Sequence, residues 1–207
     1  MADVFELFPT PVMHVAGAVP RATVDALRTR FAAQADTAND RSTALAHTRV
    51  LAPTEDESLR QLAVTLTPHV AAFGTHLFGE SLRWLIKEMW VNVLQTGGSQ
   101  SVHNHANCFV SGVLYLTESH PSSRTMFIRS LGGREFAFRN THEGAGVGPF
   151  NAEKWAAPEC APGDLVLFPS SLLHEVPANR GATRVTLAFN AIPHRLDAWG
   201  YAVSFLP

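Results

Sequence analysis

Residues 82–94 read LRWLIKEMWVNVL, and this stretch decides the fold class of the chain. Apolar side chains return at about every second position, which is the period of a β-strand with one buried face. A turn is expected directly after it, at Gln95–Gly98, because the sequence Gln-Thr-Gly-Gly favours chain reversal. Further short strands are expected at residues 109–116, 125–128, 134–138, 165–168, 184–191 and 198–205.

The chain before this stretch has a helical period instead. Pro20 opens a helix that is expected to run to about Ala35, and a second helix begins near Thr54–Glu57. Pro68 is expected to kink or divide this second helix. Two helices followed by about eight short strands predict an α+β protein, with the helices packed on one sheet of an antiparallel sandwich.

The composition indicates a globular protein that stays inside the cell. The 207 residues fit one domain, with a helical part at about 1–80 and a β-rich core at about 81–207. With 46% hydrophobic and 16% charged residues, the chain can bury a large core. The net charge of −2 and the lack of a Lys/Arg cluster argue against nucleic acid as a partner. No apolar run of about 18 residues and no leader is present, so we expect a soluble, cytoplasmic protein without membrane contact. Cys108 and Cys160 are expected to be free thiols.

Three histidines form a candidate metal site. His103 and His105 flank Asn104 and therefore point to the same side of an extended segment, and His174 can join them from another strand. Three neutral imidazoles can hold one iron ion and leave open positions for substrates. The open alternative is that the pair is merely two exposed histidines. Glu175 is expected to face away from His174, and Glu118 and Asp164 are weaker candidates. The other seven histidines are expected to be structural or exposed: His14, His47, His69, His76, His120, His142 and His194.

A candidate carboxylate pocket accompanies this site. Arg184 lies in an apolar strand, where a buried guanidinium requires an anionic partner. That partner is either a small organic acid or a structural Asp or Glu. Inward-facing polar residues on the expected strands complete the candidate cofactor-binding set: Thr186, Tyr115, Asn92 and Asn190.

Five sequence pieces in this order resemble a small bacterial group of Fe(II)/2-oxoglutarate-dependent oxygenases. They are Trp90-Val91-Asn92, His103-Asn104-His105-Ala106, Ser111-Gly112-Val113-Leu114-Tyr115-Leu116, Gly163 to Ser170 and Arg184 to Asn190. The resemblance covers about residues 84–192. It implies a double-stranded β-helix (jelly-roll, cupin-like) core, with Fe(II), 2-oxoglutarate and O2 as cofactor and cosubstrates. It also implies that Arg184, helped by Tyr115 and Thr186, binds the distal carboxylate of 2-oxoglutarate.

The chain departs from the family pattern at two positions. The broader superfamily usually has a carboxylate at the second ligand position, where this chain has His105, and Ala106 replaces the group's proline. The expected reaction is hydroxylation of a small molecule such as an amino acid, peptide or natural-product intermediate, with desaturation or cyclisation open. Two alternatives remain: a three-histidine cupin-type metalloenzyme that does not use 2-oxoglutarate, and a non-catalytic jelly-roll binding module.

Residues 140–161 form a long polar connection. It is expected to be either a substrate lid carrying Phe150, Lys154 and Trp155 or an irregular connection. Asn107, Arg129 and Arg139 are further candidates for the substrate pocket. The extended arm at residues 5–15 and exposed strand edges are compatible with a homodimer.

Overall fold

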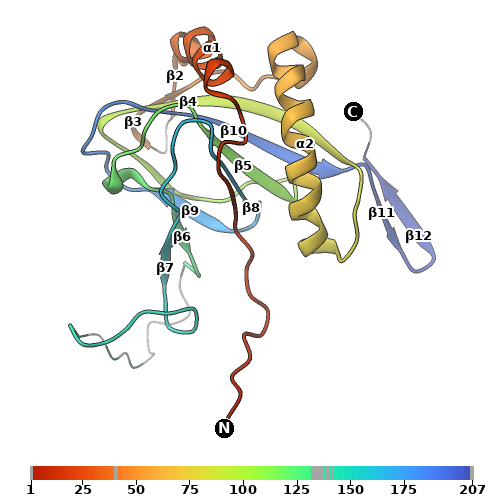
Figure 1. The fold of residues 1–207 in the computed structure, drawn as a ribbon, viewed down its shortest axis with the longest axis vertical. Helices are drawn as coiled ribbons and strands as arrows, with labels where there is room; N and C mark the ends of the chain where they lie inside the picture. The colour runs from red at the N-terminus through yellow and green to blue at the C-terminus, as the bar shows by residue number, and fades with distance from the viewer. Residues whose placement is uncertain (1, 40–41, 132–137, 139, 141, 206–207) are drawn as a thin grey trace.

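The computed structural model describes residues 2–39, 42–131, 138, 140 and 142–205. Two α-helices lie on one side of a curled sheet, and the N-terminal arm extends away from the body on the other side (Figure 1). The strand expected at residues 134–138 lies outside the described residues except for Phe138, and Arg139 lies outside them too. The described part of the chain contains both the helices and the sheet of the expected α+β class.

The two helices follow the apolar stripes of the sequence. Helix α1 (Arg21–Phe31) is extended by the short helix η1 (Ala32–Gln34), and η2 (Pro53–Glu55) precedes α2 (Glu57–Phe78). Asp56 caps α2 by accepting a hydrogen bond from the backbone of Ser58, and Gly79 ends it with a φ of 75°. Pro68 was expected to kink or divide α2, and it does not divide it, because flanking side chains buried against the sheet hold the helix together across the proline; a kink there stays a prediction. Within the described residues, neither helix has the length and hydropathy needed to cross a bilayer.

Ten strands of the described chain form one continuous sheet that curls into two layers. The larger layer has the order β1 (Met13–Val15), β8 (Leu165–Pro169), β5 (Val110–Tyr115), β10 (Arg184–Pro193), β4 (Trp84–His103), β3 (Ser42–His47) and β2 (Thr37–Ala38). The smaller layer continues from the end of β4 through β9 (Leu173–Val176), β6 (Met126–Ile128) and β7 (Lys154–Ala156). Helix η3 (Pro121–Ser123) precedes β6, and β11 (Arg195–Ala198) and β12 (Tyr201–Ser204) form a separate hairpin.

Strand β4 is the link between the two layers. The expected turn at Gln95–Gly98 is wrong, because the strand continues through it to His103. Gly97 takes a φ of 81°, and its N–H donates to the carbonyl of Asn179 (2.6 Å). The glycines thus bend the strand instead of reversing it, so that its first part pairs with β10 and its end pairs with β9. A strand shared in this way closes the jelly roll.

The two faces of the larger layer have different roles. Val185, Leu187 and Phe189 of β10 face the helices and belong to the main apolar core. Phe189 lies opposite Gly112 of β5, where a Cβ atom would come within 2.2 Å of the phenylalanine ring. By alternation, Arg184 and Thr186 face the interior between the two layers. The polar residues of β10 are therefore enclosed by the fold.

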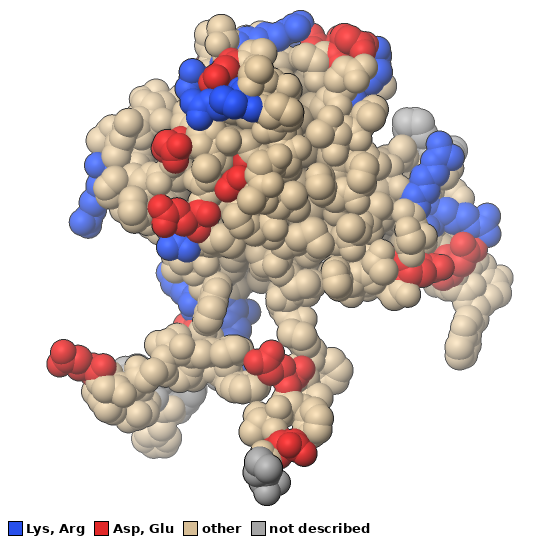
Figure 2. All heavy atoms as spheres, in the orientation of Figure 1, with Lys and Arg blue, Asp and Glu red and all other residues tan. Residues whose placement is uncertain are grey.

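Charged side chains lie mostly at the periphery of the molecule. On the face shown in Figure 2, Lys and Arg are interspersed with Asp and Glu, and the central area carries few charges. That face therefore presents no extended field of one sign.

Candidate metal and carboxylate site

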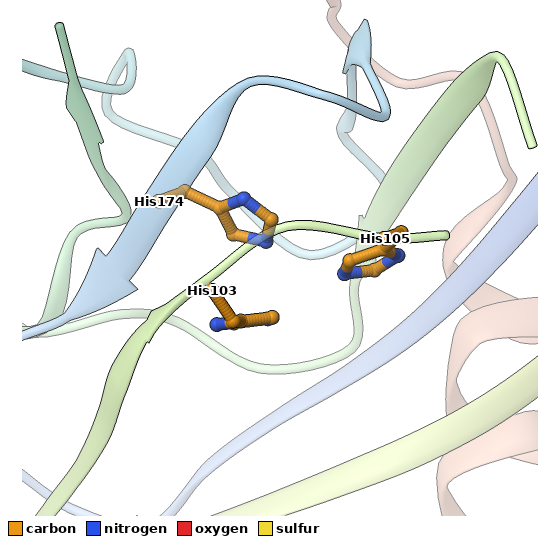
Figure 3. A group of neighbouring side chains, drawn as sticks. All are labelled: His103, His105 and His174. Carbon is orange, nitrogen blue, oxygen red and sulfur yellow. The ribbon is translucent and has the colours of Figure 1, made fainter. Parts of the chain in front are cut away.

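The three candidate histidines meet in the interior, near the end of β4. His103 is the last residue of β4 and lies directly opposite His174 of β9, and His105 follows two residues later (Figure 3). The ring centroids are 4.2 Å apart for His103 and His174, 5.1 Å for His105 and His174, and 5.3 Å for His103 and His105. One nitrogen from each ring lies within 4.8 Å of the others. This spacing allows a single ion to contact all three rings.

An irregularity in β4 turns His103 toward its partners. Gln100 lies opposite Val176, and His103 lies opposite His174, so three steps along β4 match two steps along β9. The extra residue is a β-bulge, which reverses the alternation of side chains beyond it. In a regular strand, His103 would lie three steps from Gln100 and would point away from the face that carries Gln100 and His174. The bulge therefore places His103 in the interior.

Hydrogen bonds at the second ring nitrogen fix how each histidine is protonated. Nδ1 of His103 lies 2.8 Å from the carbonyl oxygen of Ser101, and Nδ1 of His174 lies 2.9 Å from that of Leu172. A carbonyl oxygen only accepts hydrogen bonds, so Nδ1 carries the proton in both rings. The lone pair is then on Nε2, the atom left for a metal. A weak contact of 3.4 Å to the amide nitrogen of Gln100 reaches Nε2 of His103.

His105 has side-chain partners. Its Nδ1 lies 2.7 Å from Oδ1 of Asn190, and the amide nitrogen of Asn190 donates to Glu88 (2.7 Å). The hydroxyl of Ser111 lies 2.8 Å from the same Oδ1 and 2.9 Å from the hydroxyl of Ser170. The sequence predicts Asn190 among the cofactor-binding residues, and in the structure its carboxamide contacts His105. Glu88 was missed, although it shares the alternation of Asn92 and lies opposite Asn190.

Burial keeps all three imidazoles neutral. Desolvation lowers the pKa of His103 and of His105, in the latter case against the opposing effect of the Asn190 hydrogen bond. Desolvation, followed by the neighbouring His103, lowers the pKa of His174 to about 3. A neutral ring offers its lone pair without first losing a proton, so this set fits a divalent transition metal.

The Arg184 side chain is buried without an acidic partner among the described residues. Only 5% of the residue is exposed. Its Nε donates to Ser119 (3.2 Å), Nη2 reaches Thr125 (3.4 Å), and the guanidinium lies 5.2 Å from the centre of the Tyr115 ring. No Asp or Glu in the described chain forms an ion pair with it. A buried positive charge with only neutral partners fits a site for an anionic ligand.

The other candidate pocket residues lie beside Arg184. Thr186 pairs with Asn92 on one side and with Tyr115 on the other, so the three side chains share the interior face of adjacent strands. Burial raises the pKa of Tyr115, which therefore remains a neutral hydrogen-bond donor. Tyr115 packs in the same cluster as Phe168, whose ring lies 4.8 Å from that of His174. The guanidinium and the histidines therefore line one continuous interior.

The acidic candidates lie elsewhere. Glu175 faces outward and pairs with Lys154 (2.6 Å), as expected for its position beside His174, and Glu118 is exposed. Asp164 belongs to a separate group with His14 and Cys160. Its carboxylate accepts hydrogen bonds from His14 and from the backbone of Gly17 and Ala161. Burial raises the pKa of Asp164, but these hydrogen bonds outweigh it and hold the pKa below its usual value. Through His14 and Gly17, Asp164 fixes the N-terminal arm to the body of the protein.

The connection at residues 140–161, expected to be a lid or an irregular loop, contains a strand that the sequence did not predict, β7. Trp155 lies opposite Phe127, which in turn lies opposite His174, so Trp155 shares the face of the histidine. Lys154 points to the other face, where Glu175 holds it. Arg129 donates to the backbone of Phe150 (3.0 Å) and thus anchors the segment. Of the expected lid residues, Trp155 shares the strand face of His174 but is itself exposed.

Comparison with known families and structures gives a consistent picture. Residues 88–190 match the family model described as "Putative 2OG-Fe(II) oxygenase". The matched segment contains all three histidines and Arg184, and it begins at Glu88 and ends at Asn190. No curated protein sequence matches the chain.

Solved structures of similar fold are distant in sequence. HygX from Streptomyces hygroscopicus, with nickel and 2-oxoglutarate bound, has a TM-score of 0.62 and 16% identity over 89% of this chain and 84% of that chain. SnoN, a non-heme α-ketoglutarate-dependent epimerase from nogalamycin biosynthesis, has a TM-score of 0.62 and 16% identity over 93% and 81%. A prolyl-4-hydroxylase from Pseudomonas putida has a TM-score of 0.59 and 18% identity over 87% and 92%. At this identity the likeness concerns the fold, and it confirms the double-stranded β-helix core.

Proposed function

This chain belongs to the 2OG-Fe(II) oxygenase family, and we propose that it hydroxylates a small organic molecule at the interior site. The whole chain, residues 1–207, serves as one catalytic unit. The observation that carries the proposal is the joint placement of three neutral imidazoles and of a buried guanidinium, which has no acidic partner among the described residues, in the interior between the two layers.

His103, His105 and His174 hold the iron through Nε2. The Nδ1 contacts to Ser101, Asn190 and Leu172 orient the rings, so that all three lone pairs are directed inward. When bound, Fe(II) together with 2-oxoglutarate and O2 supplies the oxidising power for attack on an unactivated C–H bond. Because the three ligands are neutral, the set carries one negative charge less than two histidines and a carboxylate would.

Arg184 binds the distal carboxylate of 2-oxoglutarate. A guanidinium offers two parallel N–H donors to a carboxylate, and Tyr115 and Thr186 add hydroxyl groups from the adjacent strands. Asn92 borders the same pocket. Burial of Arg184 strengthens this recognition, because little water competes for the charged hydrogen bonds.

The prime substrate is a small molecule admitted beside the lid that carries Trp155. Structures of similar fold were solved with hygromycin B or nogalamycin RO bound, so the fold accommodates such ligands in those proteins. Trp155 is 54% exposed and shares the face of His174, which suits an aromatic wall that packs on an entering substrate. A homodimer remains a prediction, which light scattering of the purified protein tests.

A succinate-formation screen tests the proposal. The protein is incubated with Fe(II), ascorbate and 2-oxoglutarate over a library of amino acids, peptides and natural-product intermediates, and succinate is measured because it forms whatever the fate of the substrate. We expect substrate-dependent succinate in the parent protein and in His76→Ala, a variant at an exposed helix position, and none in His103→Ala. Oxygen consumption that is independent of 2-oxoglutarate would favour the three-histidine cupin alternative and reject the proposal.

A further inference from the structure

We infer that Glu88 and Asn190 form a positioning pair that sets the tautomer of His105 and aims its Nε2 into the site. The pair lies on neighbouring strands, since Asn190 of β10 is directly opposite Glu88 of β4. The part of the inference that concerns metal affinity rests on the proposed function, whereas the part that concerns the tautomer does not.

His105 differs from the other two histidines in the kind of partner it has. His103 and His174 donate to backbone carbonyls, which cannot change from acceptor to donor. His105 lies beyond the end of β4, where its backbone N–H donates to Ser170 (2.9 Å), and its Nδ1 meets a carboxamide. A carboxamide has a donating and an accepting end of nearly equal shape, so an isolated Asn190 could present either one.

Glu88 removes this ambiguity. A carboxylate only accepts hydrogen bonds, so the amide nitrogen of Asn190 must face Glu88 (2.7 Å), which leaves Oδ1 to face His105. Oδ1 then accepts the Nδ1 proton, and the lone pair of His105 is on Nε2. The reversed amide would place an N–H group against Nδ1, move the proton to Nε2 and block the ligand atom.

The surrounding contacts support the same orientation. The Ser111 hydroxyl lies 2.8 Å from Oδ1 and 3.2 Å from Nδ1 of His105, and Asn190 is only 4% exposed. Lys87 also pairs with Glu88 (3.1 Å). Glu88 therefore has a second contact, and a control variant at Lys87 separates this ion pair from the positioning of His105.

The test uses metal-free protein with 15N-labelled histidine and long-range nitrogen–proton correlation spectra, which report the protonated ring nitrogen. In the parent protein we expect the Nδ1–H form for all three site histidines. In Asn190→Leu and in Glu88→Gln, the His105 signal should shift toward the Nε2–H form or a mixture, with His103 and His174 as internal references. Lys87→Gln should leave the spectrum unchanged.

A double variant supplies the rescue. In Glu88→Gln/Asn190→Asp, the carboxylate at position 190 accepts the proton of His105 Nδ1, and the amide at position 88 donates to that carboxylate. The Nδ1–H form of His105 should therefore return. Co(II) titration should follow the same order, with affinity lowered by about 10- to 100-fold in Asn190→Leu and largely restored in the double variant. An unchanged His105 tautomer in both single variants would overturn the inference. A shifted tautomer in a protein that binds no Co(II) would uphold the pair and reject the metal site instead.

Discussion

Arg184→Met distinguishes two roles for a buried guanidinium. The side chain contacts Ser119, Thr125 and the Tyr115 ring and has no acidic partner among the described residues. If its partner is the distal carboxylate of 2-oxoglutarate, the variant should lose affinity for the cosubstrate while the cosubstrate-free protein keeps its stability.

The magnitudes follow from these contacts. Truncating one partner of a buried, hydrogen-bonded charge pair costs about 2–5 kcal/mol, which is roughly 30-fold to several-thousand-fold in dissociation constant. Without cosubstrate, the variant loses a cation–π contact of about 0.5–2 kcal/mol and two hydrogen bonds of about 1 kcal/mol each. The variant also no longer buries an uncompensated charge, and this stabilises the folded state by several kcal/mol. We expect the free energy of unfolding to change by less than about 1.5 kcal/mol, or about 5 °C in Tm.

Anaerobic binding of 2-oxoglutarate to Co(II)-loaded protein and thermal unfolding with and without cosubstrate measure both quantities. At about 100 times its dissociation constant, 2-oxoglutarate should stabilise the parent protein by about 2.7 kcal/mol and leave the variant unchanged. Arg180→Met, at an exposed arginine just before β10, is the matched control and should behave as the parent. Unaltered cosubstrate binding combined with a loss of about 3–5 kcal/mol in stability would refute the reasoning, because that result identifies an arginine paired with an acid of the protein.

Three further changes test the site and the fold. His103→Ala should abolish stoichiometric metal in protein analysed by elemental mass spectrometry, and His76→Ala should retain it; equal metal content in both would contradict the ligand assignment. Asp164→Asn should lower the free energy of unfolding by about 1–3 kcal/mol at neutral pH. Because the folded pKa of Asp164 lies below its unfolded value of about 4, the difference should shrink as denaturation is repeated at lower pH, and a pH-independent difference would count against it. Gly112→Ala should destabilise by about 1–3 kcal/mol in thermal unfolding, because the added methyl meets the buried ring of Phe189, and an unchanged Tm would contradict this packing.

Much of the interior could be predicted from alternation alone. Strand β10 pairs on both sides over most of its length, so the side chains of Arg184 and Thr186 keep the period of two that the sequence displays. The helices could be predicted equally well; in α1, for example, Val24, Leu27 and Phe31 lie on one buried stripe. These features depend on neighbours within one element, which a sequence reveals directly.

The remaining features depend on residues far away in the chain. The path of β4 through Gly97 depends on its contacts with Asn179, and the bulge before His103 depends on its pairing with β9. The partner of Asn190 depends on which residue of β4 lies opposite it, so the link to Glu88 becomes visible only once the register is known. Local patterns carry no information on such pairings.

The bulge near the end of β4 makes this segment sensitive to an added residue. Inserting one residue between Gln100 and His103, with the bulge unchanged, would place His103 opposite Leu173 and direct it away from His174, whereas deleting Ser101 or Val102 would remove the bulge and leave His103 opposite His174. By contrast, residues 142–152 include no strand and should accept insertions without disturbing the three histidines. Chimeras and loop transplants in this protein should therefore add no residue between Gln100 and His105 and place their insertions in residues 142–152.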